Sequence, residues 1–125
     1  MTARTPRFGI LVLQNTDWPA TVERVQRYEA LGFDTVWVAD HYVDPWDPSG
    51  PWFECWTLLA ALAAQTSRVH VGPLVSHVIY RNPAVLARQT LTTDHVSGGR
   101  MVLGLGAGAS RYDHPMTGSV CWKPA

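Results

Sequence analysis

Asp40 and His41 are adjacent in the 125-residue chain, where an apolar run gives way to polar residues. The apolar, β-branched run 35–39 ends at Asp40 and His41, so it predicts a buried strand that delivers two titratable groups to its carboxyl end. An imidazole titrates near neutral pH, and a neighbouring carboxylate can fix its tautomer. The pair could therefore orient a substrate hydroxyl or move a proton beside a hydride transfer.

The same two residues also have a purely structural interpretation. Asp40 could cap the loop that follows it, and His41 could be hydrogen-bonded within that loop. Neighbouring residues of a strand point to opposite faces, so one of the two should face away from a shared site unless the strand ends at Asp40. From the residues alone, both interpretations stay open.

The other histidines show no spacing typical of a zinc site, and no metal is expected. His77 follows a Gly-Pro pair and is a candidate for the wall of a site. His70, between two valines of a predicted strand, and His95, at a predicted helix end, are explained by structure. Cys55 and Cys121 match no metal or redox spacing, so two reduced thiols are expected.

The elements that must position these residues alternate between strands and helices. Strands are predicted for 8–13, 33–39, 69–76 and 101–108, and helices for about 19–31, 53–66 and 83–96. Gly72 and Pro73 predict a bulge or a distorted end in the third strand. The alternation requires parallel strands and right-handed crossovers, which leaves an open doubly wound sheet or a piece of a (β/α) barrel.

A long loop follows the predicted strand that carries Asp40. Residues 42–52 contain three prolines, a glycine and two tryptophans, Trp46 and Trp52. Loops of this length in compact domains are often binding loops, where tryptophan offers a flat apolar surface to a ligand. The alternative is that the two tryptophans only hold the loop against the domain.

Composition excludes several classes of partner. Ten basic and ten acidic residues give a formal net charge of zero without a run of either sign, which predicts neither nucleic-acid nor membrane-surface binding. No apolar segment reaches the length of a membrane span, so a cytoplasmic location is expected. The chain suits one domain over 1–125, with a flexible N-terminus over 1–7 and an irregular tail over 109–125.

Four motifs between Phe8 and Gly108 resemble, in order and spacing, the luciferase-like monooxygenase family. They are Asp40-His41, the segment 72–75, the segment 80–84, and the segment 94–100 that leads into the glycine-rich run 104–108. The approach to Asp40 over 31–37 is most similar to the branch that uses the deazaflavin coenzyme F420. The FMN-dependent branch is the alternative.

This resemblance implies an α/β fold of the (β/α) TIM-barrel type, of which the chain supplies the N-terminal half: about four parallel strands and three helices of an incomplete barrel. It also implies a flavin or deazaflavin ring across the carboxyl ends of the strands, backed by a non-proline cis peptide near Leu74-Val75. The implied catalytic residues are Asp40 and His41. The implied cofactor-binding residues are Leu74, Val75, Ser76, Gly106, Ala107 and Gly108.

The sequence thus predicts an N-terminal fragment of a luciferase-like flavin- or deazaflavin-dependent oxidoreductase that acts on a small organic substrate by hydride transfer or monooxygenation. Coenzyme F420 is the expected cofactor and FMN the alternative. A competing hypothesis is a truncated, catalytically incompetent half-barrel that binds a partner or forms a homodimer through its open strand edges. A third is a complete small doubly wound domain with helices on both faces of its sheet.

Overall fold

The computed structural model describes residues 5–108 and 112–118. Its main sheet holds three parallel strands in the order β1 (Gly9–Val12), β2 (Thr35–Val38) and β3 (His70–Pro73). A second parallel pair, β4 (Ser76–His77) and β5 (Leu105–Gly106), lies beyond the end of β3. An isolated parallel bridge from Val71 to Met101 shows that the last strand also runs alongside β3. All of these pairings are parallel, as the alternating pattern predicts.

Helices follow the strands along the chain: α1 (Trp18–Ala30), α2 (Cys55–Gln65), α3 (Pro83–Ser97) and a short α4 (Asp113–Thr117). The Asp17 and Asn82 side chains cap α1 and α3, and each cap is followed by a proline in the first turn. α3 ends at Gly98, whose φ of 69° is one that glycine adopts without strain. The first three helices are thus bounded much as the sequence predicts.

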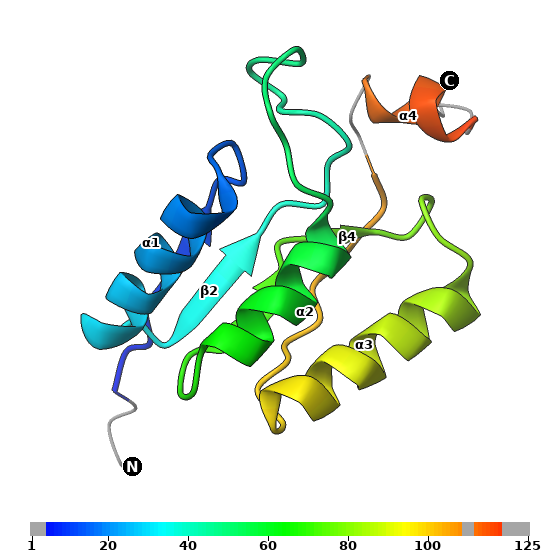
Figure 1. The fold of residues 1–125 in the computed structure, drawn as a ribbon. Coiled ribbons are helices and arrows are strands. Elements are labelled where there is room, and N and C mark those ends of the chain that lie inside the picture. Colours follow the sequence, from blue (N-terminus) through cyan, green and yellow to red (C-terminus); the bar gives the residue numbers. More distant parts are fainter. Residues whose placement is uncertain (1–4, 109–111, 119–125) are drawn as a thin grey trace.

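The three long helices cover one face of the main sheet and leave the other face uncovered (Figure 1). The strand residues of the covered face pack with helix residues in one buried cluster: Val12, Val25, Val36, Val38, Cys55, Trp56, Leu58, Leu59, Leu62, Ala63, Val69, Val71 and Leu86. On the opposite face the register aligns Leu11, Trp37 and Gly72, and Leu11 is 42% exposed. This one-sided arrangement is that of a barrel segment and excludes the doubly wound alternative.

The predicted third strand is broken in two. β3 ends at Pro73, a cis peptide joins Leu74 to Val75, and β4 begins at Ser76. Both the distorted end predicted from the Gly72-Pro73 pair and the cis bond implied by the family resemblance are therefore confirmed.

Two glycines let the last strand approach this break. A Cβ added at Gly104 would lie 2.6 Å from the Pro73 carbonyl oxygen, and one at Gly106 would collide with the Val75 side chain. The glycine-rich run is therefore needed for packing within the protein, in addition to any approach to a ligand.

The tail predicted to be irregular contains α4, so it is not irregular throughout. The rest of that prediction over 109–111 and 119–125, the first four residues of the predicted flexible N-terminus, and Cys121 lie outside the described residues. Cys55 is a free, buried thiol, and burial raises its pKa above the ordinary range. Within the described residues, no helix combines the length and hydrophobicity that crossing a membrane requires.

Candidate functional site at the carboxyl ends of the strands

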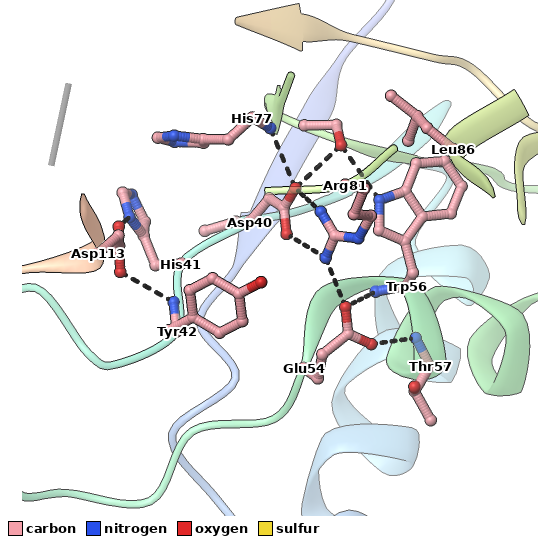
Figure 2. A network of polar contacts seen from close by, with 12 residues as sticks. Asp40, His41, Tyr42, Glu54, Trp56, Thr57, His77, Arg81, Leu86 and Asp113 are labelled. Atoms are coloured by element: carbon pink, nitrogen blue, oxygen red, sulfur yellow. Dashed lines mark hydrogen bonds and ion pairs between the residues drawn. The ribbon is translucent and has the colours of Figure 1, made fainter. Parts of the chain in front are cut away.

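Asp40, directly after β2, lies at the centre of a buried polar network (Figure 2). Its Oδ2 accepts hydrogen bonds from Ser76 Oγ at 2.9 Å, from the His77 backbone N–H at 3.0 Å and from Arg81 Nη1 at 2.6 Å. Its Oδ1 accepts from Arg81 Nη2 at 2.9 Å. With only 3% of Asp40 exposed, these bonds tie the end of β2 to β4 and to the loop before α3.

Arg81 extends this network to the start of α2. Its Nη2 also donates to Glu54 Oε1 at 2.6 Å, and Glu54 caps α2 by accepting from the backbone N–H groups of Trp56 and Thr57. Burial opposes ionisation of Glu54, but the hydrogen bonds from Thr57, Trp56 and Arg81 outweigh it and hold the pKa of Glu54 below its usual value. The start of α2 therefore presents an ionised carboxylate to Arg81.

Ser76 belongs to the same network. Its hydroxyl donates to Asp40 and accepts from Trp56 Nε1 at 3.1 Å, and the residue is completely buried. Both hydrogen-bonding directions of this predicted cofactor contact are thus used inside the protein.

Gln14 holds the strand end that carries Asp40. This fully buried side chain donates through Nε2 to the carbonyl oxygens of Ala39 and Phe53, both at 2.8 Å, and its Oε1 accepts from the Ala39 N–H at 3.2 Å. The loop after β1, the end of β2 and the approach to α2 are therefore joined by one amide.

His41 faces a different carboxylate from the one beside it in sequence. Its Nδ1 lies 2.6 Å from Asp113 Oδ2, while Asp113 Oδ1 accepts from the Tyr42 backbone N–H at 3.0 Å. The Asp113 side chain is fully buried, whereas that of His41 is 26% exposed. Asp40 and His41 thus point to separate partners and do not form an acid–base pair with each other (Figure 2).

Three aromatic rings gather beside His41, and we call His77, Tyr80 and Tyr42 the aromatic cluster. His77 meets His41 edge to face at 5.2 Å between ring centroids and stacks on Tyr80 at 4.4 Å, and Tyr42 lies 4.8 Å from Tyr80. Burial, followed by the nearby His41, lowers the pKa of His77. Burial, followed by Asp113, raises the pKa of Tyr80. All three rings of the cluster are therefore uncharged near pH 7.

His77 presents a buried polar atom without a partner. Its Nδ1 makes no hydrogen bond within the described residues, and a Cβ at Gly108 would lie 3.0 Å from it. Native structures leave few buried polar atoms unpaired, and a group that binds there is one physical explanation. The carboxyl ends of the strands therefore offer an unused polar atom next to a glycine.

The structure brings the predicted cofactor-binding residues to one edge of the molecule. β4 and β5 pair with Ser76 opposite Leu105 and His77 opposite Gly106; Gly106 also lies against the Val75 side chain, and Gly108 lies near the His77 ring. Leu74 is 48% exposed and Ala107 is also exposed, whereas Val75 packs near Gly106. Of these predicted residues, Leu74 and Ala107 are exposed to solvent, whereas Ser76 is completely buried.

The two loop tryptophans behave differently. Trp52 Nε1 donates to the His41 carbonyl oxygen at 2.8 Å, so Trp52 holds the loop against the site. Trp46 is 75% exposed and remains available for contact with another molecule. The structural alternative therefore holds for Trp52, and the binding alternative stays a prediction for Trp46.

Several residues of the site were missed by reasoning from the sequence. Arg81 and Tyr80 stand in the segment 80–84 that carries part of the resemblance, but the sequence alone predicts no role for either. Asp113 lies 72 residues after His41 in a stretch without periodicity, and no local signal connects the two. His70 donates from Nδ1 to the backbone carbonyl oxygen of Asp34, at the start of β3 and far from this edge, in keeping with its structural interpretation. Among the described residues, no three His, Cys, Asp or Glu side chains are grouped so as to hold a metal ion.

A one-sided parallel α/β unit with a broken third strand defines a segment of a (β/α) barrel. The chain belongs to the luciferase-like monooxygenase family, whose model matches residues 3–123.

Curated relatives include coenzyme F420-dependent enzymes. The F420-dependent glucose-6-phosphate dehydrogenase of Amycolatopsis mediterranei is 39% identical over 101 residues, which cover 78% of this chain and 29% of the relative. The 5,10-methylenetetrahydromethanopterin reductase of Archaeoglobus fulgidus is 32% identical over 102 residues, which cover 82% of this chain and 28% of the relative. The chain therefore spans less than a third of the length of these relatives.

Solved structures give the same extent of overlap. An F420-dependent secondary alcohol dehydrogenase, solved with an F420–acetone adduct, superposes with a TM-score of 0.81 at 27% identity, covering 92% of this chain and 36% of that one. The oxygenating constituent of 3,6-diketocamphane monooxygenase from Pseudomonas putida, solved with FMN, superposes with a TM-score of 0.75 at 22% identity, covering 90% and 32%. The second likeness is one of fold alone. Both are consistent with an incomplete barrel.

Proposed function

We propose that this chain is the N-terminal part of a deazaflavin-dependent oxidoreductase that transfers a hydride between its cofactor and a small organic substrate. The observation that carries this proposal is His41, which is partly exposed, held 2.6 Å from a buried carboxylate, and placed at the carboxyl ends of parallel strands. In (β/α) barrels the chemistry occurs at that end. The F420-dependent relatives favour coenzyme F420 over FMN.

The residues at the broken strand fit a flat ring. Leu74 would back the ring with its exposed side chain, Ala107 and Gly108 would border it, and His77 would offer its unpartnered Nδ1. Ser76 and Asp40, both buried and fully hydrogen-bonded, would support this surface from behind. When bound, the deazaflavin or flavin ring supplies the hydride acceptor or donor.

His41 would move the proton that accompanies the hydride. In the direction of alcohol oxidation, the substrate carbon gives up hydrogen with its electron pair, and the hydroxyl proton passes to the His41 nitrogen that does not face Asp113. The product is a carbonyl compound, and the histidine leaves the step as an imidazolium beside a carboxylate. Asp40 takes no part in this transfer, because both of its oxygens are occupied by Ser76, His77 and Arg81.

Titration of the purified chain with coenzyme F420 and with FMN, followed by cofactor fluorescence, tests the proposal. We expect coenzyme F420 to bind more tightly than FMN, and His77→Ala to weaken its binding. The matched control is His70→Ala, which removes a histidine at the opposite end of the strands and should leave binding unchanged. A folded, monomeric chain that changes the fluorescence of neither cofactor would contradict the proposal.

A second candidate function is supported by the uncovered face of the sheet. Leu11, on that face, is 42% exposed, and Leu105, in β5 of the second sheet, is 56% exposed; exposed apolar surfaces beside open strand edges favour self-association. In that case the chain would act as a half-barrel that binds a second copy. Analytical ultracentrifugation distinguishes the two candidate functions. A stable monomer that binds cofactor is expected of the oxidoreductase segment and not of the self-associating half-barrel.

A further inference from the structure

Asp113 contacts His41 in a geometry that fixes the carboxylate as well as the ring. One carboxylate oxygen lies 2.6 Å from His41 Nδ1, and the other accepts from the Tyr42 N–H at 3.0 Å. The two oxygens of Asp113 thus bind the His41 side chain and the Tyr42 backbone. The carboxylate therefore cannot rotate or move away without losing one of these hydrogen bonds. Its side chain is completely buried, so water does not replace either partner.

We infer that Asp113 is a positioning residue, which keeps the proton of neutral His41 on Nδ1 and so leaves Nε2 as the nitrogen that meets the substrate. This inference rests on the proposed function only in making His41 the group that moves the proton. An ionised carboxylate can accept hydrogen bonds but cannot donate them, so its partner nitrogen must carry the hydrogen. His41 Nε2 makes no hydrogen bond within the described residues and is free to accept a proton.

The rings around His41 cannot impose the same tautomer. His77 meets His41 through ring contact and makes no hydrogen bond to it, and Tyr80 stacks on His77 and not on His41. The backbone carbonyl of His41 is bound by Trp52, which fixes the main chain and not the imidazole. Among the described residues, the ring's proton placement therefore depends on Asp113.

Nitrogen-15 NMR of the histidine rings tests this inference without any cofactor. Long-range proton–nitrogen spectra at about pH 8, where an ordinary imidazole is neutral, distinguish a nitrogen that carries hydrogen from one that does not. In the unmodified chain we expect Nδ1 of His41 to carry the hydrogen. His41→Gln assigns the signals, and His70, whose Nδ1 faces the Asp34 carbonyl oxygen at 3.2 Å, serves as an internal reference.

Asp113→Asn is the decisive variant. An asparagine can donate to Nδ1 as well as accept from it, so it can hold the opposite tautomer. We expect the preference for Nδ1–H to be lost or reversed at His41, with His70 unchanged, and Asp113→Glu to restore part of it. Asp17→Asn, which exchanges the same side chain at an exposed helix cap, should leave both rings unchanged.

The result separates this inference from the proposed function. If His41 keeps its hydrogen on Nδ1 in Asp113→Asn, or carries it on Nε2 in the unmodified chain, the inference is wrong even when the chain binds coenzyme F420. If the tautomer changes as expected but no cofactor binds, the inference stands and the proposed function fails. Backbone amide spectra show whether Asp113→Asn is folded. If it is not, Asp113→Glu takes its place. In that variant, hydrogen on Nδ1 of His41 supports the inference, and hydrogen on Nε2 overturns it.

Discussion

Asp40 and His41 are neighbours in sequence, yet their surroundings differ in almost every respect. Asp40 is buried, and its two oxygens accept four hydrogen bonds, two of them from one guanidinium. His41 is partly exposed, touches one carboxylate through Nδ1 and meets an uncharged ring on its flank. Within the described residues, both Asp40 oxygens have hydrogen-bond partners, whereas His41 Nε2 has none.

This difference indicates that adjacent residues at the end of β2 have different roles, one structural and the other proposed to be chemical. The Asp40 network joins β2, β4, α2 and the loop before α3, so its loss should disturb the whole unit. Among the described residues, the His41 pair joins the strand end to α4, so its loss should disturb fewer elements. Substitutions at and around these two residues therefore test whether the division is real.

The largest effect is expected for Asp40→Asn. The amide keeps the size of the side chain but leaves the buried Arg81 with one carboxylate instead of two, so we expect the free energy of unfolding to fall by about 3–5 kcal/mol. Urea denaturation followed by tryptophan fluorescence measures this change. Asp17→Asn is the matched control, and an effect of Asp40→Asn as small as that of the control would contradict the prediction.

Glu54→Gln should have a smaller, pH-dependent effect of about 1 kcal/mol near neutral pH, because the cap and the ion pair are weakened and not removed. The pKa of Glu54 is lowered from 4.5 in the folded protein. The carboxylate's contribution is therefore complete above pH 4.5 and is lost as the pH falls through the lowered value. Denaturation curves of the two proteins should converge in acid, and a constant difference across this window would exclude the assignment.

His77 should produce a change in a separate pH window. Its pKa is lowered from 6.5, so the unfolded chain binds the proton more readily and stability falls as the pH drops below 6.5. We expect a loss of about 1 kcal/mol or less between neutral pH and pH ~5.5. His77→Gln should remove this loss and His70→Gln should not. Equal slopes in His77→Gln and the unmodified chain would show that the ring is not desolvated.

The smallest effect on stability is expected for His41→Gln. The new amide can still donate to Asp113, so the buried carboxylate keeps a partner, and we expect a loss of about 0.5 kcal/mol or less in the free energy of unfolding. The same urea series measures it. A loss as large as that of Asp40→Asn would erase the distinction between the two residues.

The fold was largely predictable because its signals are local. The apolar run before Asp40, the caps at Asp17 and Asn82, and the glycine after α3 each act within a few residues. Even the broken third strand was indicated by Gly72 and Pro73. The local sequence does not predict that Glu54 caps α2, because glutamate is not a preferred N-cap residue.

The site was less predictable because its partners lie far apart in the chain. Arg81 is 41 residues from Asp40, and Asp113 is 72 residues from His41. Periodicity carries no information about such pairs, which form only when parallel strands bring their carboxyl ends together. The sequence therefore predicts a candidate site at Asp40 and His41, whereas only the structure shows which residue each of them contacts.

α3 is flanked by two arginines that both bond to α2. Arg81, just before α3, pairs with Glu54 at the start of α2, and Arg100, just after α3, donates through Nη2 to the carbonyl oxygens of Ala63 and Thr66 at the end of α2. Because these hydrogen bonds join α2 and α3 at both ends, the two helices cannot slide or tilt independently. Their amide protons should exchange with solvent in a single cooperative opening, and the motion that admits a ligand should therefore come from the 42–52 loop, which carries the exposed Trp46.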